Sequence, residues 1–144
     1  MKMHFVVLSK LFHSSYSLLI AGYGFLFLSL FLLIFKQDIN VLNLTLCICA
    51  ILIGLLHHYV SIRVIFDAKL LQYLSKKIDY SNIDSLTKEL DQSLITLKLM
   101  PIDKANKSWK LRLIGCQKLF KIQIFIFLIQ IFMLIFMFFY VYNA

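Results

Sequence analysis

Three long apolar segments without any Asp, Glu, Lys or Arg constrain this chain more than any other feature. They cover residues 16–35, 41–62 and 122–142. Each has roughly the twenty residues that an α-helix needs to cross a hydrocarbon core of about 30 Å. A helix also satisfies its own backbone hydrogen bonds, which lipid cannot do. The sequence therefore predicts an all-α integral membrane protein with three transmembrane helices, and its 61% hydrophobic content agrees.

Basic residues are distributed unevenly around these segments. Residues 63–121 hold 12 of the 15 Lys and Arg, residues 1–15 hold two, and none follows residue 142. The positive-inside rule then places the N-terminal tail (1–15) and residues 63–121 in the cytoplasm and the C-terminus outside. We expect a multi-pass protein of the bacterial inner membrane, with the basic region near anionic lipid head groups. Because no nucleic-acid-binding motif accompanies the charge, no nucleic-acid partner is expected.

The basic region between the second and third segments has a helical pattern of its own. No Pro or Gly interrupts residues 61–79, so the second helix is expected to continue to about residue 78. Apolar residues at helical spacing predict another helix from about 83 to 99, stopped by Pro101. These two helices are expected to form a small basic cytoplasmic hairpin. Residues 109–121 mix Trp and Leu with Lys and Arg, which predicts an interfacial helix before the third span.

Small and polar residues form a stripe on the second span. They recur every three or four positions and therefore share one helix face: Asn43, Cys47, Ala50, Gly54, His57 and Ser61. The short break at 36–40 makes the first two spans antiparallel neighbours. On the first span, Ser17, Ala21 and Gly24 form a small face, and small residues let helices approach closely in lipid. We expect this face to contact the stripe.

The third span has two strongly polar residues, Gln123 and Gln130, which lie one heptad apart and hence on one face. An amide in lipid needs a hydrogen-bond partner from a neighbouring helix. Two interpretations have equal support: packing within this chain, or docking against a larger membrane protein. Around the cytoplasmic boundary, residues expected at lipid head groups are Arg63, Trp109, Lys110, Lys118 and Lys121.

Three histidines, His13, His57 and His58, are expected near one membrane depth. Such a set could ligate a metal or hold a haem between helices, or it could have a proton-linked role. However, adjacent histidines on a helix diverge by about 100°, and no carboxylate lies at that depth. Packing and interhelical hydrogen bonds are therefore the favoured interpretation, with no cofactor. The three cysteines provide no disulfide framework.

Catalytic signatures are absent from the sequence. It has no glycine-rich phosphate loop, no HExxH, no CxxC and no carboxylate within a span. The sequence therefore favours a non-catalytic accessory or assembly subunit of a larger inner-membrane complex, docking through its small and polar helix faces. Two alternatives stay open. One is a homo-oligomeric channel or small transporter component lined by the stripe, and the other is a haem- or quinone-linked electron-transfer subunit built on the three histidines.

Overall fold

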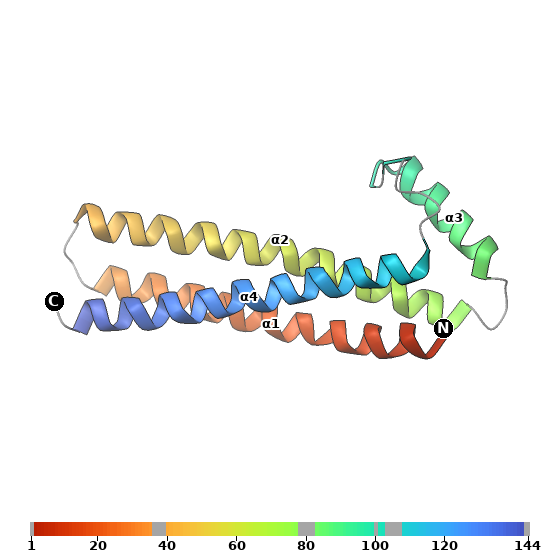
Figure 1. The fold of residues 1–144 in the computed structure, drawn as a ribbon. Coiled ribbons are helices and arrows are strands. Elements are labelled where there is room, and N and C mark those ends of the chain that lie inside the picture. Colours follow the sequence, from red (N-terminus) through yellow and green to blue (C-terminus); the bar gives the residue numbers. More distant parts are fainter. Residues whose placement is uncertain (1, 36–39, 78–82, 100, 103–107, 143–144) are drawn as a thin grey trace.

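The structure, a computed structural model, is helical wherever it forms regular elements. It describes residues 2–35, 40–77, 83–99, 101–102 and 108–142, and no strand occurs among these. Four α-helices follow one another along the chain: α1 (Lys2–Phe35), α2 (Val41–Lys77), α3 (Ile83–Thr96) and α4 (Trp109–Tyr142) (Figure 1). Of these, α1, α2 and α4 are long and apolar enough to cross a membrane. The all-helical prediction with three spanning-length helices is confirmed.

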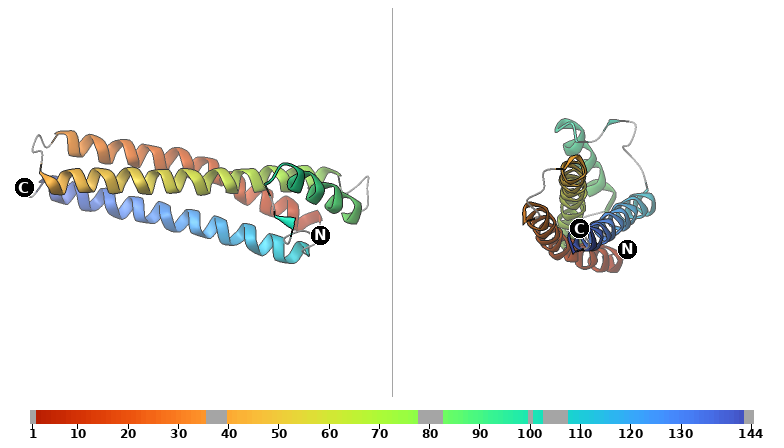
Figure 2. Two further views of the ribbon diagram at one scale, coloured as in Figure 1. Left: turned by 90° about the horizontal axis from the view of Figure 1, so that it is seen from above. Right: turned by 90° about the vertical axis from the view of Figure 1, so that its left-hand side faces the viewer.

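The three long helices lie side by side in an up-down-up bundle (Figures 1 and 2). Helices α1 and α4 run in the same direction. Helix α2 packs beside both and runs in the opposite direction. They contain 34, 37 and 34 residues. At a rise of about 1.5 Å per residue, each is about 50 Å long or more, well beyond the roughly 30 Å of a hydrocarbon core. One end of the bundle therefore has room to lie outside a bilayer.

Buried residues on each long helix follow a repeat of three and four positions. On α1 the buried side of the helix comprises Phe5, Leu8, Phe12, Ser15, Gly22, Ser29 and Leu33. On α2 it comprises Asn43, Ala50, Gly54, His57, Val60, Ser61, Val64, Ala68, Leu71, Leu74 and Ser75. This spacing keeps one face of each helix toward its neighbours along the whole bundle, as in coiled coils.

Residues 2–15, expected as part of an N-terminal tail before the first span, belong to the bundle. They form the first turns of α1, and Phe5 and Phe12 are fully buried there. Phe5 meets the edge of Trp109 with ring centroids 4.9 Å apart, and Phe12 lies 5.3 Å from Phe120. Aromatic pairs at such distances add to the stabilisation from burial. This end of the bundle thus has a core of its own.

Residues 109–121, expected as an interfacial helix, are part of a longer helix. They continue without a break into the third span as the single helix α4. Trp109, Leu113, Cys116 and Leu119 pack against the cluster that contains Phe5 and Phe12. The apolar side of this basic segment is therefore covered by α1 and α2. An amphipathic pattern of this kind suits a membrane surface and a helix neighbour equally well, and here helix neighbours cover it.

The short helix α3 stands at an angle to the bundle and is joined to the start of α4 (Figure 1). Trp109 donates from Nε1 to the Thr87 hydroxyl at 2.8 Å. Arg112 donates two hydrogen bonds of 2.7 Å to the Asp91 carboxylate, and both side chains are largely buried. Among the described residues, direct packing between α2 and α3 is slight, so the hairpin predicted for them is at most loosely formed.

A cavity of about 480 Å³ lies between α2, α3 and α4. Its apolar lining includes Leu70 and Leu74 from α2 and Leu90 and Leu94 from α3. Leucines from both helices of the predicted hairpin thus line one cavity. Arg63, Asp67 and Arg112 also line it, so its polar residues carry both signs of charge.

Helix α3 ends at Thr96, a few residues before the predicted end at Leu99. The Leu99 amide donates to the Leu94 carbonyl at 2.9 Å, and the Lys98 amide donates to the Ile95 carbonyl at 2.9 Å. This pair of bonds is a Schellman motif. Lys98 occupies its left-handed position with a φ of 55°. The chain therefore leaves the helix through a defined cap before it reaches Pro101.

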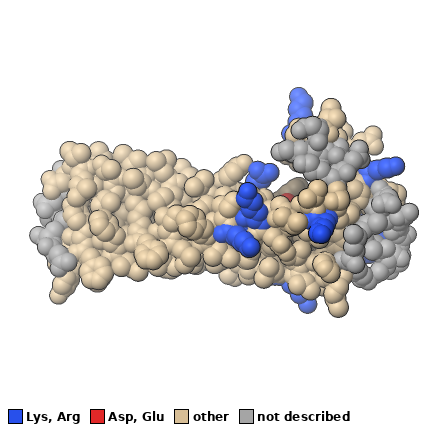
Figure 3. Space-filling view, viewed as in Figure 1, with Lys and Arg blue, Asp and Glu red and all other residues tan. Residues whose placement is uncertain are grey.

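Among the described residues, the charged side chains lie toward one end of the bundle. In Figure 3 the Lys and Arg side chains gather over the end where α1 begins and α3 stands, and the described residues of the other half are uncharged. Exposed side chains of that half are large and apolar, such as Phe27, Ile34, Phe132 and Phe136. The molecule is therefore a long rod with one apolar half and one basic half.

Candidate functional site

The most distinctive site is a layer of three polar residues buried where α1, α2 and α4 meet. Ser15, Ser61 and Gln123 come from these three helices in turn, and each is completely buried. Ser15 Oγ donates to Gln123 Oε1 at 2.6 Å. Gln123 Nε2 donates to Ser61 Oγ at 2.9 Å and to the Ser15 carbonyl oxygen at 3.3 Å. One amide therefore connects all three helices.

The hydrogen-bonding capacity of the Gln123 amide is fully used within this layer. The Gln123 amide has two N–H donors and one carbonyl acceptor, and each of them has a partner in the layer. Because the three residues are uncharged, the layer avoids the much larger cost of burying an ion. Its chemistry is that of a specific helix-to-helix connection, since neither serine has a neighbouring base in the layer to activate its hydroxyl.

A second buried layer, made of Gly22, His57 and Gln130, lies one heptad further along α1 and α4. His57 is 1% exposed and Gln130 is 6% exposed. A Cβ atom added at Gly22 would lie 2.5 Å from His57 Cε1 and 3.1 Å from Gln130 Oε1. The His57 ring also packs on Phe127, with centroids 5.9 Å apart. The His57 ring can therefore pack this closely against α1 only because residue 22 is a glycine and has no Cβ.

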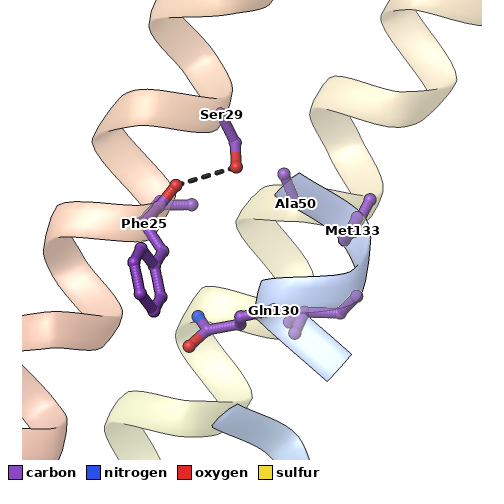
Figure 4. A pocket seen from close by; sticks show the side chains of 7 residues that line it. Phe25, Ser29, Ala50, Gln130 and Met133 are labelled. Carbon is purple, nitrogen blue, oxygen red and sulfur yellow. Dashed lines mark hydrogen bonds between the residues drawn. The ribbon is translucent and has the colours of Figure 1, made fainter. Parts of the chain in front are cut away.

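Hydrogen bonding in this second layer is less complete. Within the part of the chain that the structure describes, His57 Nε2 and Gln130 Oε1 are buried without a hydrogen-bond partner. Gln130 extends into the space beside Phe25 and Ser29 of α1 and Ala50 of α2 (Figure 4). A cavity of about 10 Å³ lies there, enough for about one water molecule. Ser29 Oγ, on its wall, donates to the Phe25 carbonyl at 2.7 Å.

The stripe predicted on the second span faces the interior of the bundle. Asn43, Ala50, Gly54, His57 and Ser61 are all buried, and Cys47 is half-buried. A Cβ at Gly54 would lie 3.0 Å from Leu26 Cδ2 on α1, so α1 and α2 approach closely there. Five of the six stripe residues are thus covered by helices of the same chain.

The small face predicted on the first span, in contrast, points mostly outward. Ser17 and Gly24 are exposed, Ala21 is half-buried, and a Cβ at Gly24 would meet no atom within 4 Å. The expected contact between this face and the stripe is therefore wrong at Ser17 and Gly24. The helix is turned so that Ser15, Gly22 and Ser29 face the other helices instead.

The three histidines do not converge. His57 lies inside the bundle, whereas His58 is half-exposed and forms a hydrogen bond through Nδ1 with the Tyr23 hydroxyl on α1. His13 is exposed and lies in a groove beside Ala68 and Lys69, about three turns along α2 from His57. Among the described residues, no group of three or more His, Cys, Asp or Glu side chains could hold a metal ion.

The residues expected at lipid head groups lie at the basic end of the bundle. Arg63, Lys110, Lys118 and Lys121 are exposed there. Trp109 is half-buried, because it packs against Phe5, bonds to Thr87 and has the Arg112 guanidinium 5.2 Å from its ring centroid. Its indole N–H is thus used within the chain.

Several residues of the site were not singled out from the sequence. Ser15, Gly22 and Ser29 are one heptad apart, as are Gln123 and Gln130. A search for matching heptads on the first and third spans would have found both layers. The pairing of Asp91 with Arg112, in contrast, has no such signal, since it depends on how α3 is placed.

Comparisons with known proteins add no family assignment: no protein-family model, curated protein or solved structure matches this chain. The site must therefore be interpreted from its own chemistry, which is that of neutral amides, hydroxyls and one imidazole held between three helices.

Proposed function

We propose that this chain is a multi-pass protein of the bacterial inner membrane, with its N-terminus in the cytoplasm and its C-terminus outside. The apolar half of the bundle supports membrane insertion, since the exposed side chains of its described residues are uncharged. The basic half supports the orientation, because Lys and Arg are retained on the cytoplasmic side. The basic cytoplasmic region then consists of the projecting ends of the bundle helices together with α3.

Within that membrane, the proposed role is that of a non-catalytic accessory or assembly subunit of a larger complex. The observation that carries this proposal is the outward-facing small patch of Ser17, Ala21 and Gly24 on α1. Apart from the neighbouring residues and backbone of α1 itself, no atom of the described chain lies within 4 Å of a Cβ placed at Gly24. Small residues are what a membrane helix needs for close backbone approach to another helix. A partner helix is the proposed occupant.

The buried polar layers support the same role indirectly. Their donors and acceptors stabilise the chain's own bundle, as the three bonds of Gln123 illustrate. The glutamine face of α4 is thus engaged inside the chain, and a partner would dock on α1 rather than on Gln123 and Gln130.

The two alternatives have less support from the geometry. A pore between copies of the chain would need the stripe on an outer surface, but five of its residues are buried within one copy. A haem held by two of the three histidines would need converging imidazoles, and His13, His57 and His58 face three different surroundings.

Purification of the tagged full chain in a mild detergent tests the accessory role. We expect a membrane protein to co-purify in a fixed ratio and to be lost in the Gly24→Leu variant, because the added side chain would keep the partner helix at a distance. Gly115→Leu is the matched control, since Gly115 also has open space around it but lies on α4 at the basic end. A chain that purifies alone, or equal loss of the partner in both variants, would contradict the proposal.

A further inference from the structure

A groove between α1 and α2 at the basic end combines basic and polar walls with an apolar floor. Its volume is about 380 Å³. His13 and Tyr16 from α1 and Lys69 and Gln72 from α2 form its exposed walls, and the buried residues Phe12 and Ala68 form its floor. Among the described residues, no Asp or Glu lines it. The groove is therefore electropositive at its walls and apolar at its base.

The charge of this groove differs from that of the larger cavity on the other side of α2. That cavity contains Asp67 together with Arg63 and Arg112, and Arg112 is engaged by the Asp91 carboxylate. Asp67 and Lys69, two positions apart on α2, line different cavities. Lys69 therefore determines which ligand charge the groove favours, and that charge is negative.

The position of the groove along the bundle identifies the kind of anion. His13 and Tyr16 lie where the apolar segment 16–35 begins, and Lys69 and Gln72 lie about two and three turns beyond the end of segment 41–62. If the bundle is inserted as proposed above, this is the level of the cytoplasmic head groups. Tyr is enriched at this level, and a Lys side chain extends along apolar surface to reach it.

We propose that the groove binds one anionic phospholipid. The phosphate would interact with the Lys69 ammonium, and the Tyr16 hydroxyl and the Gln72 amide are further donors on the same walls. The first part of an acyl chain would lie over Phe12 and Ala68, where a small residue leaves room between the helices. This inference rests on the proposed membrane insertion, but it does not depend on the accessory role.

Native mass spectrometry of the full chain in detergent tests the proposal, with dioleoyl phosphatidylglycerol and dioleoyl phosphatidylcholine as probes. We expect a one-to-one adduct that forms at lower concentration with phosphatidylglycerol. Lys69→Gln should weaken that adduct by about five-fold, as expected for removing one basic residue near an anionic lipid, and should leave phosphatidylcholine binding unchanged. Lys69 is exposed, so the variant should fold normally.

Lys76→Gln is the matched control, because Lys76 is an exposed lysine one heptad further along α2 and does not line the groove. Equal losses in the two variants would show that diffuse charge attracts the lipid, and equal binding of the two lipids would show that charge is not recognised. Either result would overturn the proposal. Carbonate extraction of membranes checks insertion separately: a chain released by carbonate contradicts the membrane placement, whereas a retained chain without lipid preference contradicts only this inference.

Discussion

Gln123 shows how one residue can determine the arrangement of three helices. A bundle held only by Leu, Ile and Phe could rotate or slide its helices with little loss, because lipid is as apolar as those side chains. Gln123 removes that freedom, since its amide finds both Ser15 and Ser61 only in one register. The polar layer thus contributes specificity of packing as well as stability.

A double-mutant cycle between Gln123→Leu and Ser61→Ala measures this connection. We expect a coupling free energy of about 0.6 kcal/mol, and at most about 1.7 kcal/mol, the range found for hydrogen bonds between membrane helices. Unfolding in mixed detergent micelles, followed by circular dichroism, gives the four free energies. Ser75→Ala replaces Ser61→Ala in the control cycle, because Ser75 Oγ bonds to the Gln72 carbonyl of its own helix. Zero coupling in the first cycle would contradict the role of Gln123.

Gly22 and Gly24 offer a matched pair on α1. Helix propensity alone favours alanine over glycine by about 1 kcal/mol at both positions. At Gly22 the new Cβ would collide with the His57 ring, which Phe127 and Gln130 confine, and such overpacking costs about 1–3 kcal/mol. We expect Gly22→Ala to lower the free energy of unfolding and Gly24→Ala to raise it. The same micelle unfolding assay compares them, and a stabilising Gly22→Ala would show that the second layer is not tightly packed.

At the scale of single residues, the sequence predicts which polar residues share a helix face better than it predicts which face points into the bundle. The heptad of Gln123 and Gln130 could be recognised from their spacing, and both are indeed on one buried face. On the first span, small residues occur on two faces, one with Ser17, Ala21 and Gly24 and the other with Ser15, Gly22 and Ser29. Nothing local distinguishes them, because the choice depends on which face meets His57 and Gln123.

Among the elements, the long helices follow directly from the sequence and their ends do not. Continuous apolar segments and the absence of Pro and Gly after Ser61 predict α2 closely, and it ends at Lys77. The amphipathic segment 109–121 suited either a lipid surface or a helical neighbour. Its assignment required knowing that Phe5 and Phe12 lie opposite, which is a contact over more than one hundred residues of sequence.

The attachment of α3 to α4 includes one ion pair, between Asp91 and Arg112, beside the Trp109–Thr87 hydrogen bond. Asp91→Asn removes the charge that holds the two Arg112 hydrogen bonds, so α3 should detach more often while the bundle stays folded. Hydrogen bonds to charged groups contribute about 1.5–3 kcal/mol, which corresponds to amide exchange in α3 that is at least about ten-fold faster. Hydrogen-exchange mass spectrometry compares the variant with Glu89→Gln, an exposed acid on the same helix. Faster amide exchange throughout α1 and α2 would instead show that the Asp91–Arg112 pair stabilises the bundle itself.

For the whole molecule, the two halves of the bundle each have an apolar cluster of their own. The apolar half has a small apolar cluster of its own around Leu33, Ala50 and Met137, and the basic half has the aromatic cluster around Phe5 and Phe12. Buried polar residues lie between them. The three long helices therefore run continuously through both halves of the bundle.

Cross-linking in native membranes tests most directly whether the stripe of α2 lies inside one chain. With Cys47, Cys49 and Cys116 replaced by Ser, the pair Leu26→Cys and Gly54→Cys should form a disulfide, because Leu26 Cγ lies 3.5 Å from a Cβ built at Gly54. We predict an oxidised monomer with no free thiol on a non-reducing gel, and no dimer from Gly54→Cys alone. A dimer from Gly54→Cys alone would place the stripe between two copies and contradict this account.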